Sequence, residues 1–470
     1  MIKSRQNGKL YPFTYRAREL RVLATWIKAQ ESGLLIGLGG AGKSDLLGLL
    51  TYHPEIMRQY LPEELKVALV YVDLNNLSNY QSVTFYRVIL RSLYEAQSQL
   101  THIEPMILDR IEQLYRKVES SKDSFLCQSA LREFLFICQQ KEIRLVFMLD
   151  PFEQFFQKAP IQVLDNLRGI RDAFKANVSY IVGVRQEVAY LRASTDLGEL
   201  YEILDMHTCW LGAFEEDDTR YVIEQLETKL AHTFIPEHRD KLVDLTGGYP
   251  ALIKTVGWWI FEQLPTPPDP ETWLDSLMKV TPVMHRLQEL WDGLTKEQQH
   301  TLMMLQTVSA EKSSESRQKK LKQPTEEHEI VLKRLEAKHL CQQTDQGWKI
   351  FSPLFFQFIK PLGPLGAGKI YKDEKGRFFR GNKELTDLAG KSHLLLILTY
   401  FLTWPYEVHS IDTLGEVGWP DKYPDVSDVS VQGAISNLRK RIEPIQGKHC
   451  YLKTVVKSGY RFYPEGAPSI

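Results

Sequence analysis

The residues best suited to chemistry stand near the beginning of the chain, where a glycine-rich stretch leads into a lysine and a serine. Residues 37–44 read GLGGAGKS, which matches the pattern GxxxxGK[ST]. Glycine is required in such a loop because the backbone must close around a phosphate group, with N–H groups turned inward in conformations that a Cβ atom would obstruct. The pattern predicts a phosphate-binding loop made by Gly37, Gly39, Gly40, Ala41, Gly42, Lys43, Ser44 and Asp45.

The two polar residues at the end of this loop predict what it holds. Lys43 would bring a positive charge to the β and γ phosphates of a nucleotide, and the Ser44 hydroxyl would ligate Mg²⁺. Residues 34–36 predict a short buried strand, and residues 45–50 predict the first turns of a helix, whose N-terminal dipole favours an anion. We therefore expect a P-loop that binds ATP or ADP with Mg²⁺, rather than an ordinary glycine-rich turn.

A metal-directed carboxylate is expected on a second strand. Residues 145–149 are apolar and lead directly to Asp150, the pattern of a Walker B strand. Asp150 would hold Mg²⁺ together with Ser44, and Glu153 is the nearby carboxylate that would polarise an attacking water. Because position 151 is proline, the adjacent Asp-Glu pair of typical AAA+ ATPases is absent.

Other apolar runs predict the rest of a sheet. Residues 67–73, 178–184 and 208–211 read as strands, and helical stretches separate them. This alternation predicts an α/β fold with a parallel sheet and helices on both faces. Arg185 ends the fourth strand, next to the Asp150 strand in the usual order of such sheets, so it would reach a γ-phosphate. The alternative for Arg185 is a surface arginine at a strand end.

Two further segments resemble motifs of STAND-class ATPases, the signal-transduction NTPases that include archaeal-type ATPases and NB-ARC proteins. Residues 13–20 (FTYRAREL) are similar to the F-x-x-R-x-x-E-L segment before their P-loop, and residues 246–252 (TGGYPAL) are similar to their G-x-P motif. The resemblance spans about residues 12–360 and implies nucleotide-site roles for Arg16 and Pro250, the proline at the adenine side. Gly248 and Pro250 also fit an alternative in which one helix ends and the next begins.

The region after this motif resembles the winged-helix subdomain that closes the nucleotide module of STAND proteins. Residues 294–306 and 331–340 predict helices, and residues 347–355 predict a strand and turn. In the family this subdomain usually senses nucleotide state rather than DNA. Residues 311–323 are polar and predict a solvated insertion loop, with a second nucleic-acid contact as the alternative.

A change in composition marks a separate C-terminal domain. Residues 361–369 are rich in glycine and proline, which is typical of a linker. Residues 370–372 and 377–380 predict short antiparallel strands, residues 394–403 a buried helix, and residues 428–442 an amphipathic helix. Two β-rich runs follow and predict a hairpin. Between residues 429 and 464 there are seven basic residues and one acidic residue, Glu443.

This helix and hairpin look like the recognition helix and wing of OmpR/PhoB-type response-regulator output domains. The resemblance covers about residues 370–464 and implies binding to double-stranded DNA, as in a phosphorelay output domain. It departs from the family at Asn437 and at Lys457-Ser458, where arginine and Arg-Gly are usual, and a charged solvated helix is the alternative. The expected DNA-binding residues are Gln432, Ser436, Asn437, Arg439, Lys440, Arg441, Lys453, Thr454, Lys457 and Arg461.

Composition limits the remaining choices. The chain has 470 residues and a formal net charge of -1, so any nucleic-acid surface must be local. Its five cysteines form no CxxC pair, which favours reduced thiols over disulfides or a zinc site. The N-terminus has no apolar leader, and the longest apolar run, residues 394–402, is too short to span a bilayer. We therefore expect a cytoplasmic protein with no membrane partner.

These patterns predict an α/β P-loop ATPase core at residues 1–215, a helical lid at 216–285, a winged-helix subdomain at 286–360, a linker at 361–369 and an α+β OmpR-like domain at 370–470. No phosphoacceptor domain is visible, so ATP would replace aspartyl phosphorylation as the switch. We expect a transcription regulator with slow Mg-dependent ATPase activity, nucleotide-dependent self-association and an unknown inducing ligand or protein. The alternatives are an ATPase of a defence or DNA-mobility system and a bare ATPase enzyme.

Overall fold

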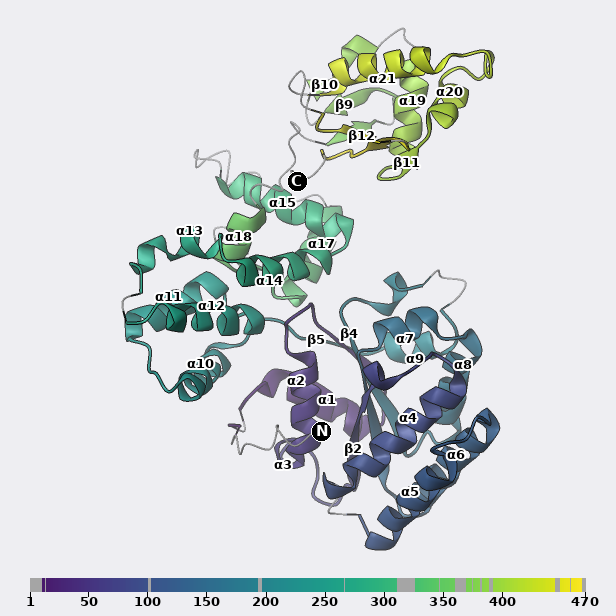
Figure 1. Cartoon of the computed structure of the whole chain (residues 1–470), viewed down its shortest axis with the longest axis vertical. Helices are drawn as coiled ribbons and strands as arrows, with labels where there is room; N and C mark the ends of the chain where they lie inside the picture. Colours follow the sequence, from purple (N-terminus) through teal and green to yellow (C-terminus); the bar gives the residue numbers. More distant parts are fainter. Residues whose placement is uncertain are drawn as a thin grey trace. The chain divides into compact units, whose positions relative to one another are not determined.

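The computed structural model describes residues 11–12, 14–99, 103–192, 197–265, 267–310, 326–345, 347–359, 369–373, 375–380, 383–388, 392–443, 449–456 and 458–466. The chain divides into two compact units (Figure 1). The first comprises residues up to Thr295 together with Glu326–Thr344 and Ile350–Phe355, and the second comprises Lys296–Thr325, Asp345–Lys349 and the chain from Phe356 onward.

A five-stranded sheet forms the centre of the first unit. Its strand order is β2-β3-β4-β1-β5, and every neighbouring pair is parallel. The order confirms that the Arg185 strand lies beside the Asp150 strand, and all five predicted strands are present. Their bounds are β1 (Gly33–Ile36), β2 (Val67–Asp73), β3 (Arg144–Asp150), β4 (Val178–Val184) and β5 (Thr208–Trp210).

Helices cover both faces of this sheet, because consecutive strand residues point to opposite faces and both sets are apolar. Leu34 and Ile36 belong to one buried cluster, whereas Leu35 belongs to another. The first cluster includes residues of α4 (Ser82–Glu95), α5 (Pro105–Val118), α6 (Ser124–Gln140), α7 (Glu153–Lys158), α8 (Ile161–Ala173) and α9 (Leu200–Asp205). The second includes residues of α1 (Ala17–Ala29), α2 (Lys43–Tyr52) and α3 (Pro54–Arg58).

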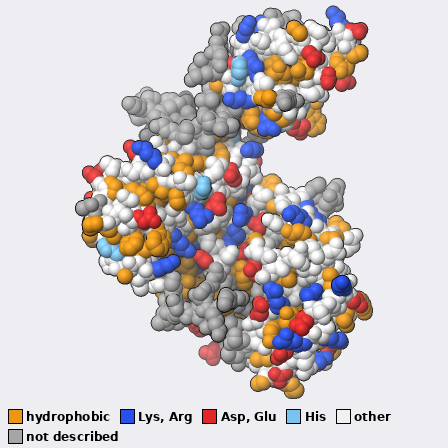
Figure 2. Space-filling model, in the orientation of Figure 1, with side chains coloured by type: hydrophobic (Ala, Val, Ile, Leu, Met, Phe, Trp, Pro, Cys, Tyr) orange, Lys and Arg blue, Asp and Glu red, His pale blue; other side chains and the backbone are white. Residues whose placement is uncertain are grey.

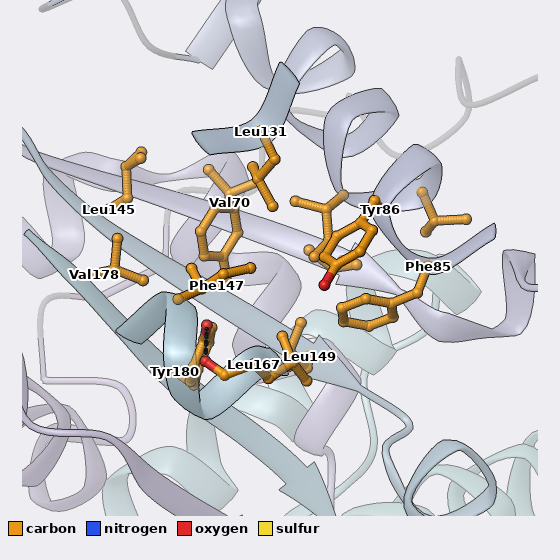
Figure 3. Close-up of a cluster of buried hydrophobic side chains, with 14 of the residues drawn as sticks. Val70, Phe85, Tyr86, Leu131, Leu145, Phe147, Leu149, Leu167, Val178 and Tyr180 are labelled. Atoms are coloured by element: carbon orange, nitrogen blue, oxygen red, sulfur yellow. Dashed lines mark hydrogen bonds between the residues drawn. The ribbon is translucent and has the colours of Figure 1, made fainter. Parts of the chain in front are cut away.

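The first cluster also shows how a buried polar group is satisfied. Figure 3 shows strand side chains such as Val70 and Phe147 gathered with Leu131 and Leu167 from the helices. Tyr180 is fully enclosed among them, and its hydroxyl donates a 2.9 Å hydrogen bond to the backbone oxygen of Leu167. The bond removes the penalty of an unpaired hydroxyl in an apolar core.

A group of helices follows the sheet in the first unit. Gly247 and Gly248 both have positive φ, 57° and 75°, so α11 stops there, and Pro250 then occupies the first turn of α12. The motif TGGYP thus acts as the helix stop and start that its residues predict. The bounds are α10 (Glu216–Leu230), α11 (Pro236–Thr246), α12 (Pro250–Glu262), α13 (Trp273–Leu277) and α14 (Thr281–Asp292).

The next elements appear in the predicted order of helix, helix and strand. They are α15 (Lys296–Ala310), α17 (Glu326–Ala337), β6 (Cys341–Thr344), β7 (Gly347–Ile350) and α18 (Pro353–Ile359). The predicted polar loop at residues 311–323 lies outside the described residues, as do residues 361–368 of the predicted linker.

The C-terminal domain of the second unit has its own core, built from residues between Ile370 and Phe462. Its sheets are antiparallel, in the orders β10-β9-β8 and β11-β13-β12. The bounds are β8 (Ile370–Lys372), β9 (Phe378–Arg380), β10 (Lys383–Glu384), α19 (Ser392–Thr403), β11 (Val408–His409), α20 (Ile411–Gly418), α21 (Asp428–Ile442), β12 (Leu452–Val455) and β13 (Gly459–Phe462). The parallel sheet, helical layers and C-terminal winged helix confirm the predicted fold class.

Three general features of the described residues are the distribution of surface charge, the apolar length of the helices and the state of the cysteines. On the face drawn in Figure 2, basic and acidic side chains are interspersed rather than gathered into one field. None of the helices among the described residues is long and apolar enough to cross a bilayer. All five cysteines are buried free thiols.

Candidate nucleotide and DNA sites

A cavity of about 340 Å³ opens over the glycine-rich loop between β1 and α2. The loop and the first residues of α2 form one wall, and a strand end and two helices form the rest. From the loop side it is lined by Leu38, Gly39, Gly40, Gly42, Lys43, Ser44 and Asp45. From elsewhere it is lined by Arg185, Pro250, Ala251, Lys254, Thr255 and Arg286.

The loop has the backbone that phosphate binding requires. Gly40 and Gly42 have φ values of 75° and 91°, in the left-handed region that favours glycine. A Cβ on Gly40 would lie 2.4 Å from the Cβ of Ala251, so that position has no room for a side chain. Helix α2 begins at Lys43, which turns its unpaired N–H groups and positive dipole end toward the cavity.

Lys43 is nearly buried at the base of the cavity, with 9% of its surface exposed. Its ammonium group donates a hydrogen bond to the backbone oxygen of Gly37. Burial lowers the pKa of Lys43, while the carboxylates of Glu153 and Asp150 act in the opposite direction. The hydrogen bond to Gly37 therefore holds the Lys43 ammonium group at the loop and restricts its side-chain entropy.

Asp150 has the surroundings of a metal ligand. Its Oδ2 accepts hydrogen bonds from the Ser44 hydroxyl at 2.5 Å and from the Tyr71 hydroxyl at 3.3 Å. Its Oδ1 is buried and has no hydrogen-bond partner. Burial raises the pKa of Asp150, while the hydrogen bond from Ser44 and the Lys43 charge oppose that rise.

An orphaned carboxylate oxygen beside a serine hydroxyl fits Mg²⁺, which prefers oxygen ligands and uses few from the protein. Asp150 and Ser44 would hold the ion, and the ion would neutralise phosphate charge. Gly183 on β4 leaves the space that Asp150 occupies, because a Cβ there would lie 2.3 Å from Oδ1. Sequence reasoning missed the Tyr71 contact, since which side chains of β2 reach Asp150 depends on strand order and register.

The structure brings the other two catalytic candidates together. Glu153, the first residue of α7, accepts a hydrogen bond from the backbone N–H of Arg185. Arg185 is exposed and lines the cavity. Lys43, Ser44, Asp150, Glu153 and Arg185 therefore converge at the carboxyl edge of the sheet, where ligands of such sheets bind.

Arg16, whose role at the nucleotide stays a prediction, contacts the backbone of the loop. It is 3% exposed and does not line the cavity. Its guanidinium donates to the backbone oxygens of Ala41 at 3.1 Å and Gly212 at 3.0 Å, and it lies over the ring of Phe214. The backbone N–H of Arg16 in turn bonds to both carboxylate oxygens of Asp218. The Arg16 side chain thus holds the loop through the backbone oxygen of Ala41.

The helices after the sheet also hold the loop. The Tyr249 hydroxyl donates a 2.9 Å hydrogen bond to the backbone oxygen of Gly39, and the backbone N–H of Ala251 donates to that of Gly40 at 3.2 Å. Pro250 lines the cavity beside them, and its place at the adenine side of a nucleotide stays a prediction.

Five cavity residues are outside the predicted set. Leu38 and Ala251 lie within the two predicted motifs, whereas Lys254, Thr255 and Arg286 lie beyond them. Lys254 lies one turn after Pro250 on α12 and pairs with Asp45 at 3.0 Å, so its helical spacing from the motif could have found it. Arg286 lies on α14, and no local pattern marks it.

The C-terminal domain presents a polar helix face. Gln432, Ser436, Asn437 and Lys440 are exposed on α21. The opposite face is buried by Val431, Ala434, Ile435, Leu438 and Ile442. Ser427 caps the helix, since its hydroxyl accepts the N–H of Ser430. This arrangement leaves one side of the helix available to a DNA groove.

Arg439 and Arg441 are less available than the other expected contacts. The Arg439 guanidinium donates to the backbone oxygen of Leu452 and, at 2.9 Å, to the Thr454 hydroxyl, and burial lowers its pKa. Arg439 therefore ties the helix to the hairpin. Arg441 is partly buried, and its guanidinium donates to the backbone oxygen of Asn437.

Glu443 makes a second tie between helix and hairpin that sequence reasoning missed. Its carboxylate accepts backbone N–H groups from Cys450, Tyr451 and Leu452. The single acidic residue of the basic segment is thus structural. In the hairpin, Lys453 lies opposite Arg461, and Val456 is 80% exposed near the tip. Lys457 lies outside the described residues.

Comparison with known proteins identifies part of the chain. Residues 386–462 match a family model described as transcriptional regulatory protein, C terminal. No curated protein matches. Among solved structures, the chain is similar to a Walker-type ATPase of Pyrococcus abyssi at 15% identity, with a TM-score of 0.41 over 75% of this chain and 99% of that one.

The ORC2 protein of Aeropyrum pernix in its ADP form is also similar, at 13% identity and a TM-score of 0.41, over 75% of this chain and 95% of that one. The ORC1 protein of the same organism in complex with DNA has 15% identity and a TM-score of 0.35, over 75% and 93%. Likenesses this distant do not bear on function. The sheet order and loop geometry identify a P-loop ATPase fold, and the family match identifies a transcription-regulator domain fused to it.

Proposed function

We propose that the chain is a STAND-type transcription regulator whose DNA binding is switched by ATP and ADP. The proposal rests on one observation: the same chain has a P-loop cavity, with Ser44 bonded to Asp150, and a winged-helix domain that matches a transcriptional-regulator family. The proposal retains the predicted domain boundaries, Mg²⁺ as the metal, nucleotide-dependent self-association and a cytoplasmic site of action.

An ion pair between the segment after β4, which borders the cavity, and the residue after α17 supports a nucleotide-controlled switch rather than continuous ATP hydrolysis. Arg185 lines the cavity, and Glu187, two residues later, pairs with Lys338 at 3.6 Å. Lys338 directly follows α17, is 2% exposed on its side chain and lies over the ring of Trp210. A change at Arg185 on nucleotide binding would therefore reach the segment predicted to sense nucleotide state.

The test has two parts and uses the full chain. In calorimetry, the parent should bind ADP and a non-hydrolysable ATP analogue with Mg²⁺, and Lys43→Ala should bind neither, because the loop loses its fixed charge. Lys229→Ala, an exposed lysine on α10, is the control and should bind like the parent. Parent-like binding by Lys43→Ala would remove the nucleotide assignment.

In the second part, DNA fragments selected from a random pool are titrated at several salt concentrations. The logarithm of the affinity should fall linearly with the logarithm of salt concentration, since phosphate contacts release counterions. The affinity should also differ between the ADP and ATP-analogue forms. Equal affinities in the two forms would remove the switch, and absence of DNA binding would make the C-terminal domain a protein-docking module.

A further inference from the structure

Helix α14 lies directly against the phosphate-binding loop. A Cβ on Gly39 would lie 3.4 Å from the Cβ of Glu289, and a Cβ on Gly293 would lie 2.8 Å from Cδ2 of Leu38. Glu289 is also close enough to Tyr249, whose hydroxyl holds Gly39, to raise the pKa of that tyrosine in addition to the larger effect of burial. The loop and α14 therefore form one packed interface.

This interface places an arginine in the cavity. Arg286 lies one turn before Glu289 on α14 and lines the cavity. Its guanidinium pairs with the Glu289 carboxylate at 2.6 Å, and the two side chains are 46% and 43% exposed. An ion pair this exposed is weak and is readily exchanged for a stronger partner.

A nucleotide supplies such a partner. Its phosphates would enter a cavity whose wall already carries Lys43, Arg185 and Arg286. Arginine binds phosphate through two parallel N–H groups, an interaction stronger than an exposed pair with a carboxylate. The same phosphate charge would repel Glu289, so both effects act to separate the pair.

We infer that Arg286 is a nucleotide-phosphate ligand that exchanges the Glu289 carboxylate for a phosphate oxygen when nucleotide binds. The inference deepens the proposed function and rests on nucleotide binding at the loop. It also gives α14 a role in regulation. The helix ends at Asp292, and the second unit begins four residues later at Lys296. Helix α14 is thus the last helix before the chain enters the second unit.

The experiment compares Arg286→Ala and Glu289→Gln in the full chain, with adenosine, ADP and a non-hydrolysable ATP analogue as probes. Arg286→Ala should weaken ADP or the analogue about 10- to 100-fold, the range for a lost charge-assisted hydrogen bond, and leave adenosine unchanged. Glu289→Gln should tighten the same ligands by up to about 5-fold, because an exposed pair that competes with binding is removed. These opposite signs distinguish ligand exchange from loss of packing.

Arg220→Ala is the matched control. Arg220 is an exposed arginine on α10 that pairs with Glu216 and Asp217, and its removal should change no affinity. The inference is overturned if Arg286→Ala binds ADP and the analogue like the parent, if it loses adenosine equally, or if Glu289→Gln weakens binding. Lys43→Ala separates the two levels of failure: if that variant loses nucleotide and Arg286→Ala does not, only this inference fails. If Lys43→Ala binds normally, the proposed function fails.

Discussion

Glu153 accepts a hydrogen bond from the backbone N–H of Arg185, so the carboxylate after β3 is fixed relative to the backbone that follows β4. The two residues are 32 positions apart and meet because β3 and β4 are neighbours in the sheet. The contact uses one carboxylate oxygen of Glu153, Oε1.

Glu153→Gln should bind ATP like the parent and hydrolyse it about 100-fold more slowly or worse, because glutamine cannot accept the proton of an attacking water. The amide oxygen of glutamine still accepts the N–H of Arg185, so the local geometry is kept. Single-turnover hydrolysis and equilibrium binding of the ATP analogue measure the two effects separately. The exposed Glu63→Gln is the control. Equal turnover in Glu153→Gln and parent would assign Glu153 a purely structural role.

Asp150→Asn should remove the Mg²⁺ dependence of nucleotide binding, since the neutral amide is a poor ligand for a hard cation. Tyr71→Phe should lower the Mg²⁺ affinity about 10-fold, because Tyr71 orients Asp150 from outside the predicted ligand set. Mg²⁺ titrations of the chain with a fluorescent ADP analogue measure both. A Tyr71→Phe variant with parental Mg²⁺ affinity would show that Ser44 alone orients the carboxylate.

Substitutions in the DNA interface should separate into three kinds. Asn437→Ala should cost about 1 to 3 kcal/mol on selected DNA and little on random DNA, as expected for a base contact. Lys453→Ala should weaken all sequences and lower the salt slope by about one, as expected for a phosphate contact. Arg439→Ala should weaken all sequences without this change in slope, because it frees the hairpin from α21. A base-specific loss in Arg439→Ala would mean that Arg439 leaves the hairpin to read DNA.

Two glycines of the C-terminal domain should respond oppositely to alanine. Gly459 has a φ of 126°, and a Cβ there would lie 2.0 Å from the backbone oxygen of His409, so Gly459→Ala should destabilise the domain by at least about 2 kcal/mol. Gly433 lies inside α21 with nothing near its missing Cβ, so Gly433→Ala should stabilise it by about 0.5 to 1 kcal/mol. Hydrogen exchange of β11 to β13 peptides in the full chain measures both.

Asp218 should give the first unit a distinct pH dependence. Burial raises its pKa to about 6, aided by Glu19 and Glu215 and opposed by Arg16. Because the unfolded carboxyl loses its proton near pH 4, the folded chain binds more protons between about pH 4 and 6. The contribution of Asp218 to the free energy of unfolding therefore falls as pH rises through that window, by about 3 kcal/mol at most.

The asparagine of Asp218→Asn cannot titrate. The free energy of unfolding of this variant should therefore rise relative to that of the parent as pH rises from about 4 to 6. Denaturant unfolding at a series of pH values measures the difference. A difference that is constant across the window, or that moves the other way, would contradict the raised pKa.

The local parts of the fold could be predicted from the sequence because their signals are local. The run VALVYVD gives β2 directly, since both faces of a parallel strand are buried and the run is continuously apolar. Helix α21 was predicted to the residue from the spacing of Val431, Leu438 and Ile442. Helix α20 was not predicted, because it has only eight residues and two of them are glycine.

The parts that could not be predicted depend on tertiary placement. Arg286 reaches the cavity only because α14 packs on the loop, and Tyr71 reaches Asp150 only because β2 and β3 pair in register. The contact of Arg439 with the hairpin could not be predicted, because helical spacing does not show whether an arginine turns toward a neighbouring strand. Its contact with DNA stays a prediction. These residues carry no pattern of their own.

The burial of every cysteine makes the chain a ready background for spectroscopy. Cys127, Cys138, Cys209, Cys341 and Cys450 are all enclosed, and burial raises the pKa of Cys138 and Cys209 to about 12, so thiolate is scarce at neutral pH. A cysteine introduced at an exposed position would react with a maleimide dye or spin label long before these five. Pairs of labels on α10 and α21 could then report the distance between the two units, with and without nucleotide, in the otherwise unmodified protein.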